Sequence, residues 1–270
     1  MDDAFPSAPA VFDLDRDGYA DVAYIGDMGG QLWRWVMTDP DPDNWELEKV
    51  LEAPPHDYTV GGVPKKYYKN FFFPPTGLLR NGVLWLGVGT GERHNVKFQG
   101  IDADNDGDPD VVDGDNNRFY VFSDLYPKQI GVDSELPLDE TSLVNVTDAG
   151  CDTPFDRGYY VIAEHGEKFV TNSIVFLGTL FTGSFVPIDT TDPCVAGGEA
   201  YLCFFRFSCG EGDGPGTTEN EKRKKELGTG LPTSPRISVG DSGEEPTDPC
   251  EEMKVVVITS EGEVSSDCAG

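Results

Sequence analysis

The stretch "DLDRDGYADVAYIGDMGGQLWRWV", residues 13–36, joins an acidic loop to two runs that favour β-structure. Residues 21–27 and 30–37 are rich in β-branched and aromatic side chains, which suit strands. The glycines between these runs favour a tight turn. The stretch therefore predicts a β-hairpin that is entered through the acidic loop.

Similar runs recur along the chain, bounded by Gly, Asp, Asn or Pro, at 82–91, 117–124, 158–164, 173–186, 199–207 and 253–264. The run at 173–186 reads as a second hairpin that turns at Gly178. Capped helical periodicity is not evident. The predicted fold is all-β, an irregular β-propeller of antiparallel blades, complete or lacking blades, with calcium-binding hairpin loops.

We expect residues 1–270 to form a single propeller-like domain, a C-terminal fragment of a longer protein. Residues 210–250 have few apolar side chains and many charges, glycines and prolines. This composition predicts an insertion within the domain. In it, "KRKK" at 222–225 is expected to be a solvated loop or a short helix.

The acidic loop has a near copy, "DADNDGDPD", at 102–110. Calcium takes six to eight oxygen ligands, which carboxylates at alternate positions can supply, with a glycine at the turn. The predicted ligands of the first site are Asp13, Asp15, Asp17, the Tyr19 carbonyl and Asp21. Those of the second site are Asp102, Asp104, Asp106, the Asp108 carbonyl and Asp110, with Asp113 as an extra ligand. The competing interpretation is an acidic turn without metal, because Asp and Gly favour turns in any case.

The balance of 20 basic against 49 acidic residues gives a net charge of −29. A phosphate backbone would be repelled by such a chain, so nucleic acid is excluded as a partner. No apolar stretch approaches the roughly 20 residues that span a bilayer, so membrane insertion is not expected.

Six cysteines lie in the second half of the chain, without a CxxC pair. An even number in an acidic, Gly-rich chain predicts disulfides and a secreted setting. Six cysteines allow 15 pairings, which the sequence leaves open. A bridge between Cys209 and Cys250 across the insertion is one candidate. A bridge between Cys203 and Cys209 is not expected, because a strand would hold them about 20 Å apart.

No catalytic arrangement is evident. The three histidines, His56, His94 and His165, are scattered, and no G-x-S-x-G motif is present. "GVGTGER" at 87–93 lacks the Lys-Ser/Thr of a phosphate-binding loop. We therefore predict a protein that is not an enzyme.

Together these segments resemble the C-terminal domain of the PilY-type proteins of type IV pili. The hairpin at 13–36 resembles the calcium loop of that family. The similarity continues in family order through 67–93, "NNRFYVFSDLYP" at 116–127, 157–187, "DPCVAGGEAYLCFF" at 192–205 and "GTGLPTSP" at 228–235.

The resemblance implies a secreted protein at the pilus tip or outer membrane that is exported through the periplasm. It implies calcium-dependent control of pilus extension and retraction, pilus assembly, surface attachment and twitching motility. The implied partners are minor pilins of the tip complex, with host or abiotic surfaces. Asp13, Asp15, Asp17, Tyr19 and Asp21 match the calcium loop of the family. Two alternatives stay open: a periplasmic quinoprotein-like dehydrogenase, and an extracellular recognition propeller of integrin-like or carbohydrate-binding type.

Overall fold

The computed structural model describes residues 3–102, 104, 114–126, 136–148, 154–188, 197–208, 222–239, 253–262 and 264–268. Strands form almost all of the regular structure there, with a short 3-10 helix at Pro42–Asn44. The all-β prediction is confirmed. Within these residues, no helix has the length and apolar character needed to cross a membrane.

The first sheet is an antiparallel meander in chain order. Its strands are β1 (Ala10–Phe12), β2 (Val22–Gly26), β3 (Gln31–Val36) and β4 (Glu46–Glu52). Tyr24 lies opposite Arg34, and Ile25 lies opposite Trp33. The hairpin predicted from residues 21–37 is therefore confirmed, with the acidic loop leading into β2.

The second sheet places its most buried strand in the middle. Its order is β10 (Val144–Asn145), β11 (Gly158–Ile162), β9 (Arg118–Asp124), β8 (Val83–Gly89) and β7 (Thr76–Arg80). All pairs are antiparallel except β10 with β11. Asn81 and Gly82 join β7 to β8 with φ values of 52° and 71°, which is the left-handed pair that a tight hairpin turn needs.

The third sheet has the order β12 (Lys168–Phe169), β14 (Thr179–Pro187), β15 (Gly198–Arg206) and β16 (Lys224–Thr229), and β13 (Ile174–Phe176) also pairs with β14. The β13–β14 turn contains Gly178, as predicted, with φ of 81°. A three-stranded sheet follows, with β17 (Arg236–Val239), β18 (Met253–Ile258) and β19 (Val264–Cys268). A separate two-stranded hairpin consists of β5 (His56–Val60) and β6 (Val63–Tyr67).

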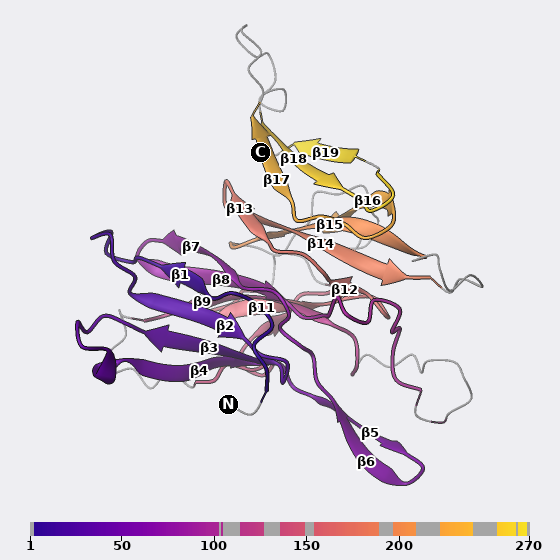
Figure 1. Ribbon diagram of the computed structural model, residues 1–270, viewed down its shortest axis with the longest axis horizontal. Coiled ribbons are helices and arrows are strands. Elements are labelled where there is room, and N and C mark those ends of the chain that lie inside the picture. Colours follow the sequence, from indigo (N-terminus) through magenta and orange to yellow (C-terminus); the bar gives the residue numbers. More distant parts are fainter. Residues whose placement is uncertain are drawn as a thin grey trace, which may run out of the picture.

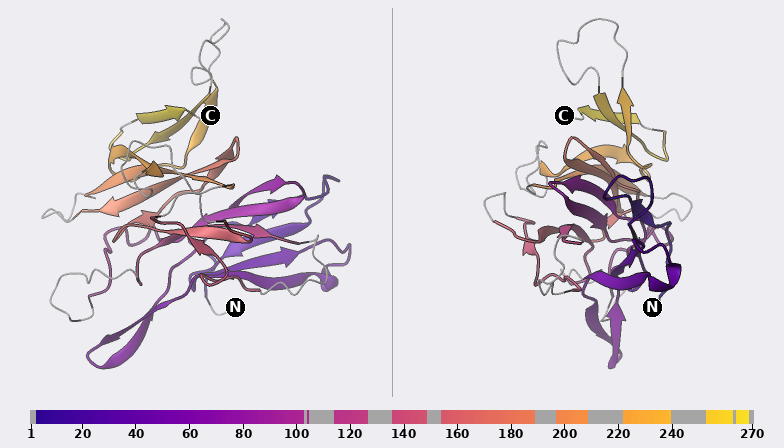
Figure 2. Two further views of the ribbon diagram at one scale, coloured as in Figure 1. Left: turned by 180° about the vertical axis from the view of Figure 1, so that it is seen from behind. Right: turned by 90° about the vertical axis from the view of Figure 1, so that its left-hand side faces the viewer.

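The sheets follow one another through the molecule, from β1–β4 past β7–β11 to β14–β15 and then β17–β19 (Figures 1 and 2). The β5–β6 hairpin projects from this body. The antiparallel sheets resemble blades, but the described residues do not close into a ring. The propeller therefore stays a prediction.

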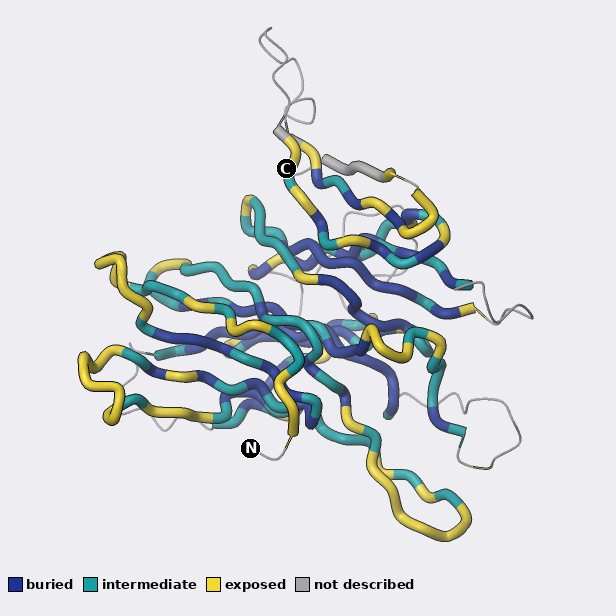
Figure 3. Tube along the Cα trace, viewed as in Figure 1, coloured by how far each residue is buried: buried dark blue, intermediate teal, exposed yellow. Residues whose placement is uncertain are grey.

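Each sheet shares an apolar core with the next one, and β9 contributes to two of these cores. Tyr120 and Phe122 join the core shared with the first sheet. Phe119 and Val121 lie in the core shared with the third sheet, beside Phe205. This alternation follows from the opposite directions of successive side chains in a strand. Buried residues accordingly concentrate along the inner strands of the sheets, whereas the projecting hairpin and the loops are largely exposed (Figure 3).

One expectation about the second half of the chain is wrong. The "KRKK" run is neither a solvated loop nor a short helix, because Lys224 and Lys225 lie in β16. Arg223 is 1% exposed and donates a hydrogen bond to the Thr147 carbonyl at 3.0 Å. Cys203 is a buried free thiol and takes part in no bridge, and disulfides among the other five cysteines stay a prediction. Cys209, Cys250 and residues 210–221 and 240–252 lie outside the described residues.

Candidate metal centre in the first aspartate loop

The first aspartate loop, residues 13–21, connects β1 to β2 and is fixed to the sheet at its end. The Asp21 amide donates to the Phe12 carbonyl at 2.9 Å, and the Met37 amide donates to the Asp21 carbonyl at 2.7 Å. The backbone of Asp21 is therefore held from both neighbouring strands. These bonds fix the position of the Asp21 backbone, from which the carboxylate faces the loop.

Backbone N–H groups fold the loop around its own carboxylates. The Asp13 carboxylate accepts from the amides of Arg16 at 2.6 Å and Gly18 at 2.9 Å. The Leu14 amide donates to Asp21 Oδ2 at 2.6 Å. Arg16 and Gly18 have φ values of 66° and 94°. A glycine meets this left-handed requirement without steric cost, which explains its place in the motif.

The loop brings three of the predicted ligands together. One carboxylate oxygen from each of Asp13, Asp15 and Asp21 lies within 4.8 Å of the others. A calcium ion held at about 2.3–2.6 Å from each ligand fits among oxygens with this spacing. Three carboxylates so close together repel one another, and a cation would remove that repulsion.

Asp17 and Tyr19 take other places in the loop. Asp17 lies outside the group of three carboxylates, and its Oδ1 accepts from the Tyr19 amide at 2.8 Å. The Tyr19 side chain is 77% exposed. The Tyr19 carbonyl stays a predicted ligand, and the Asp17 carboxylate is one that a bound ion would have to recruit.

The second aspartate loop is described only at its start. Asp102 and Asp104 are included, whereas the other predicted ligands lie outside the described residues: Asp106, Asp108, Asp110 and Asp113. The site at 102–113 stays a prediction.

Asp115, which the sequence analysis missed, closes the base of the second loop. It is 5% exposed, and its Oδ2 accepts from the Ile101 amide at 2.9 Å, while Oδ1 has no hydrogen-bond partner among the described residues. The only sequence signal was its place at the end of the acidic run.

A pocket of about 300 Å³ opens beside the first loop. It is lined by Asp15 and Asp21 together with Leu14, Thr38, Leu79, Gly82 and Tyr126. Leu79 and Gly82 belong to the β7–β8 hairpin, so the pocket lies where the first sheet meets the second. A cation in the loop would therefore act at the junction of two sheets.

A buried polar network crosses the same junction. The Asp124 carboxylate accepts from Arg34 Nη1 at 2.6 Å and from the Tyr24 hydroxyl at 2.5 Å. Arg34 also lies 4.7 Å above the Tyr126 ring and pairs with Glu48. Burial, reinforced by the charge of Asp124, raises the pKa of Tyr24 well above its usual value. Tyr24 therefore stays a hydrogen-bond donor at any physiological pH.

No protein-family model matches the chain, and no curated protein matches it in sequence. The structure is similar to the crystal structure of the Pseudomonas aeruginosa PilY1 C-terminal domain, with a TM-score of 0.58 at 13% identity. The match covers 97% of this chain and 61% of the PilY1 chain. This chain thus spans about three-fifths of that structure. The similarity confirms the predicted resemblance to a PilY1-type domain at the level of the fold, and closure into a propeller stays a prediction.

Proposed function

We propose that this chain, which has a PilY1-type fold, is a calcium-binding module of a type IV pilus biogenesis and adhesion protein. Two independent observations support the proposal. Sequence segments resemble the PilY-type family in family order, and the structure matches the PilY1 C-terminal domain over nearly the whole chain. The calcium-binding part of the proposal is supported by the convergence of Asp13, Asp15 and Asp21 at a hairpin of that fold.

In this proposal calcium acts on the junction between the first two sheets. The ion would be held by Asp13, Asp15 and Asp21, with Asp17 and the Tyr19 carbonyl recruited on binding. Because Asp21 is bonded to both neighbouring strands, ordering its carboxylate stiffens β1, β2 and the adjoining β7–β8 turn. The surface formed there would dock minor pilins of the tip complex only in the metal-bound state.

The setting that fits this role is extracellular, reached through the periplasm. The module would contribute to pilus assembly, to calcium-dependent control of extension and retraction, and to attachment and twitching motility on host or abiotic surfaces. We assign it no catalytic role. Turnover of an alcohol by the protein loaded with a quinone and calcium would contradict that assignment and favour the dehydrogenase alternative.

Isothermal titration of calcium into the parent and an Asp21→Asn variant tests the metal site. Asparagine keeps the size of the side chain but removes its charge, so we expect calcium affinity to fall by more than about tenfold. Asp43→Ala is the matched control, since Asp43 is an exposed acid in the 3-10 helix Pro42–Asn44. Equal calcium affinity in the parent and Asp21→Asn would remove the proposed site.

The pilus role needs a separate measurement in the bacterium that carries this chain. Asp21→Asn in the full-length protein should reduce surface piliation and twitching, whereas Asp43→Ala should not. If Asp21→Asn loses calcium binding in vitro but both phenotypes are normal, the assignment of the metal site stands. The role of that calcium in pilus function is then refuted.

A further inference from the structure

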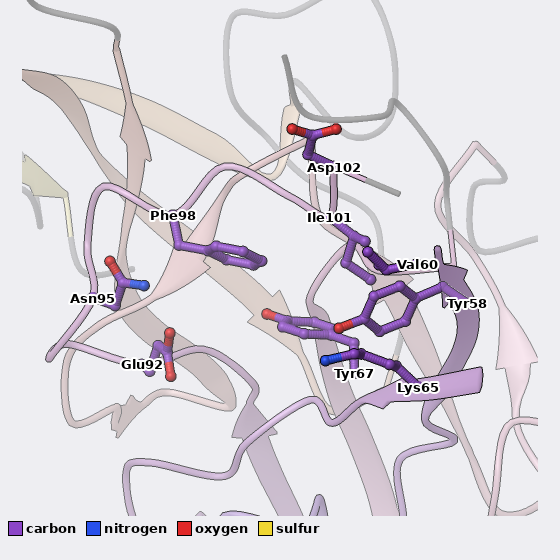
Figure 4. A pocket seen from close by; sticks show the side chains of 9 residues that line it. All are labelled: Tyr58, Val60, Lys65, Tyr67, Glu92, Asn95, Phe98, Ile101 and Asp102. Carbon is purple, nitrogen blue, oxygen red and sulfur yellow. The ribbon is translucent and has the colours of Figure 1, made fainter. Parts of the chain in front are cut away.

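A second pocket, of about 320 Å³, lies between the β5–β6 hairpin and residues 92–102 (Figure 4). It is distinct from the aspartate loop, which lies at the other end of the molecule from the hairpin (Figures 1 and 2). The groups that matter for recognition are Tyr58, Lys65, Tyr67, Glu92, Asn95 and Phe98. Its volume is at the lower end of the range of small-molecule sites, about 300–1,000 Å³.

The hairpin supplies one wall through its strand register. Tyr58 lies directly opposite Lys65, and His56 lies opposite Tyr67. Paired residues point to the same face of a sheet, so these four side chains share one face. The rings of His56 and Tyr58 are stacked at 6.4 Å. The wall is thus built from aromatic rings with one ammonium group.

Residues 92–98 supply the opposite wall, and buried contacts hold it in place. The Phe98 ring stacks on Tyr67 with 5.5 Å between centroids. Lys168, which is 1% exposed, donates to the Phe98 carbonyl and lies 5.6 Å from the Phe98 ring centroid. The Glu92 carboxylate accepts from Asn70 Nδ2 at 3.0 Å. The pocket is therefore formed before any ligand arrives, which lowers the entropic cost of binding.

Several polar groups of the pocket have no partner in the part of the chain that the structure describes. The hydroxyls of Tyr58 and Tyr67, the Asn95 amide and the Lys65 ammonium make no hydrogen bond or ion pair there. Burial and the nearby negative charges of Glu92 and Asp115 raise the pKa of Tyr67. Its hydroxyl therefore remains protonated and can donate as well as accept.

The mixture of groups selects the ligand class. A simple anion is disfavoured by the carboxylates of Glu92 and Asp102, and a simple cation is disfavoured by the Lys65 ammonium. A ligand with an apolar face and several hydroxyl groups satisfies both the aromatic rings and the free donors and acceptors. A pyranose ring has this chemistry. We propose that this pocket binds a mono- or disaccharide, with the ring against Tyr58, Tyr67 and Phe98.

The proposal is tested with defined sugars on the whole chain. Saturation-transfer NMR is run against the methyl glycosides of glucose, galactose, mannose, N-acetylglucosamine and N-acetylgalactosamine, with lactose and chitobiose, and calorimetry then measures affinity for any that bind. At least one should bind in the millimolar range or tighter. Tyr58→Ala and Lys65→Ala should each weaken binding by about tenfold, the effect of one lost stacking or hydrogen-bonding contact.

Matched controls come from the neighbouring positions. Lys66→Ala changes a lysine that pairs with Asp57 outside the pocket, and Tyr68→Ala removes an aromatic ring that does not line it. Both should bind the sugar as the parent does, and so should Asp21→Asn.

The proposal is overturned if no sugar binds in the millimolar range. It is also overturned if Tyr58→Ala and Lys65→Ala leave affinity unchanged, or if the controls lose it equally. If an unmodified acidic peptide competes for the pocket more strongly than any sugar, the sugar-binding proposal is overturned in favour of peptide binding.

Discussion

Replacing Asp124 by asparagine tests whether the buried network at the first sheet junction stabilises the fold. The carboxylate accepts two contacts from Arg34 Nη1, at 2.6 and 2.8 Å, one from the Tyr24 hydroxyl at 2.5 Å and one from the Tyr126 amide at 3.0 Å. The side chains of Asp124 and Arg34 are 4% and 6% exposed. In Asp124→Asn, one oxygen becomes an NH₂ group that faces donors, and the guanidinium loses its main counter-charge.

The expected cost follows from the burial of the pair. Removing one member of a buried ion pair typically destabilises a protein by about 3–5 kcal/mol. Glu48 still contacts Arg34 and is 46% exposed on its side chain, so the lower end of that range, about 3 kcal/mol, applies. For a domain of this size about 1 kcal/mol shifts Tm by roughly 2–4 °C, so Tm should fall by about 6–12 °C.

Urea unfolding followed by tryptophan fluorescence measures this cost. The control is Asp57→Asn, because Asp57 and Lys66 form an exposed pair with side chains 73% and 53% exposed. That change should cost less than about 1 kcal/mol. Adding Arg34→Met to Asp124→Asn should recover part of the loss, since no unpaired charge is then buried. A cost for Asp124→Asn no larger than that of Asp57→Asn would refute the reasoning.

Three further changes test other parts of the structure. Burial lowers the pKa values of Lys69 and Lys168 to about 8. Because the unfolded chain holds these protons up to about pH 10.4, the free energy of unfolding should rise from pH 8 to 10. Replacing both lysines by methionine should flatten that rise, as measured by urea titrations. A Cβ at Gly26 would lie 2.3 Å from Phe71 Cβ, so Gly26→Ala should cost about 1–3 kcal/mol, and an unchanged Tm would contradict this close approach. Burial raises the pKa of the Cys203 thiol to about 12, so site-resolved mass spectrometry should find it alkylated by iodoacetamide only after unfolding, and labelling of the folded protein would show that the site opens.

Inner strands of the sheets could be predicted because their signal is local. The runs at 21–27, 82–91, 117–124 and 199–207 match β2, β8, β9 and β15 to within two residues at each end. Each consists of β-branched and aromatic residues bounded by turn-forming residues. The grouping of these strands into stacked sheets depends on contacts between distant segments, and no local pattern encodes it.

The β5–β6 hairpin was missed although its turn was visible in the sequence. Gly61 and Gly62, with φ values of 57° and 80°, join two five-residue strands. A Gly-Gly pair between alternating segments is a recognised hairpin signal. Its lysines and proline obscured the strand pattern. The pocket wall that it forms was therefore absent from the predicted sites.

The convergence of three aspartates in the first loop was predictable because they lie within a few residues of one another. Spacing alone brought Asp13, Asp15 and Asp21 together. The burial of Arg223 could not be predicted, because its partner Thr147 lies far away in the chain. Lys224 likewise pairs with Glu164 at 2.7 Å, across the junction between the second and third sheets. From the sequence alone, a basic run surrounded by acidic residues is predicted to be exposed to solvent, because the tertiary contacts that bury it are not visible there.

The buried charges leave almost all of the net charge of −29 on the surface. Among the described residues, five basic ones are at most 5% exposed (Arg34, Lys69, Arg118, Lys168 and Arg223), and so are four acidic ones (Asp27, Asp115, Asp124 and Glu167). The two sets nearly cancel inside the protein, so the surface that solvent meets is strongly acidic. Such a surface attracts calcium over distances comparable with the Debye length, about 8 Å at physiological salt. Calcium affinity of the parent should therefore fall as sodium chloride is raised. An affinity independent of salt would mean that only the local carboxylates of the loop attract the ion.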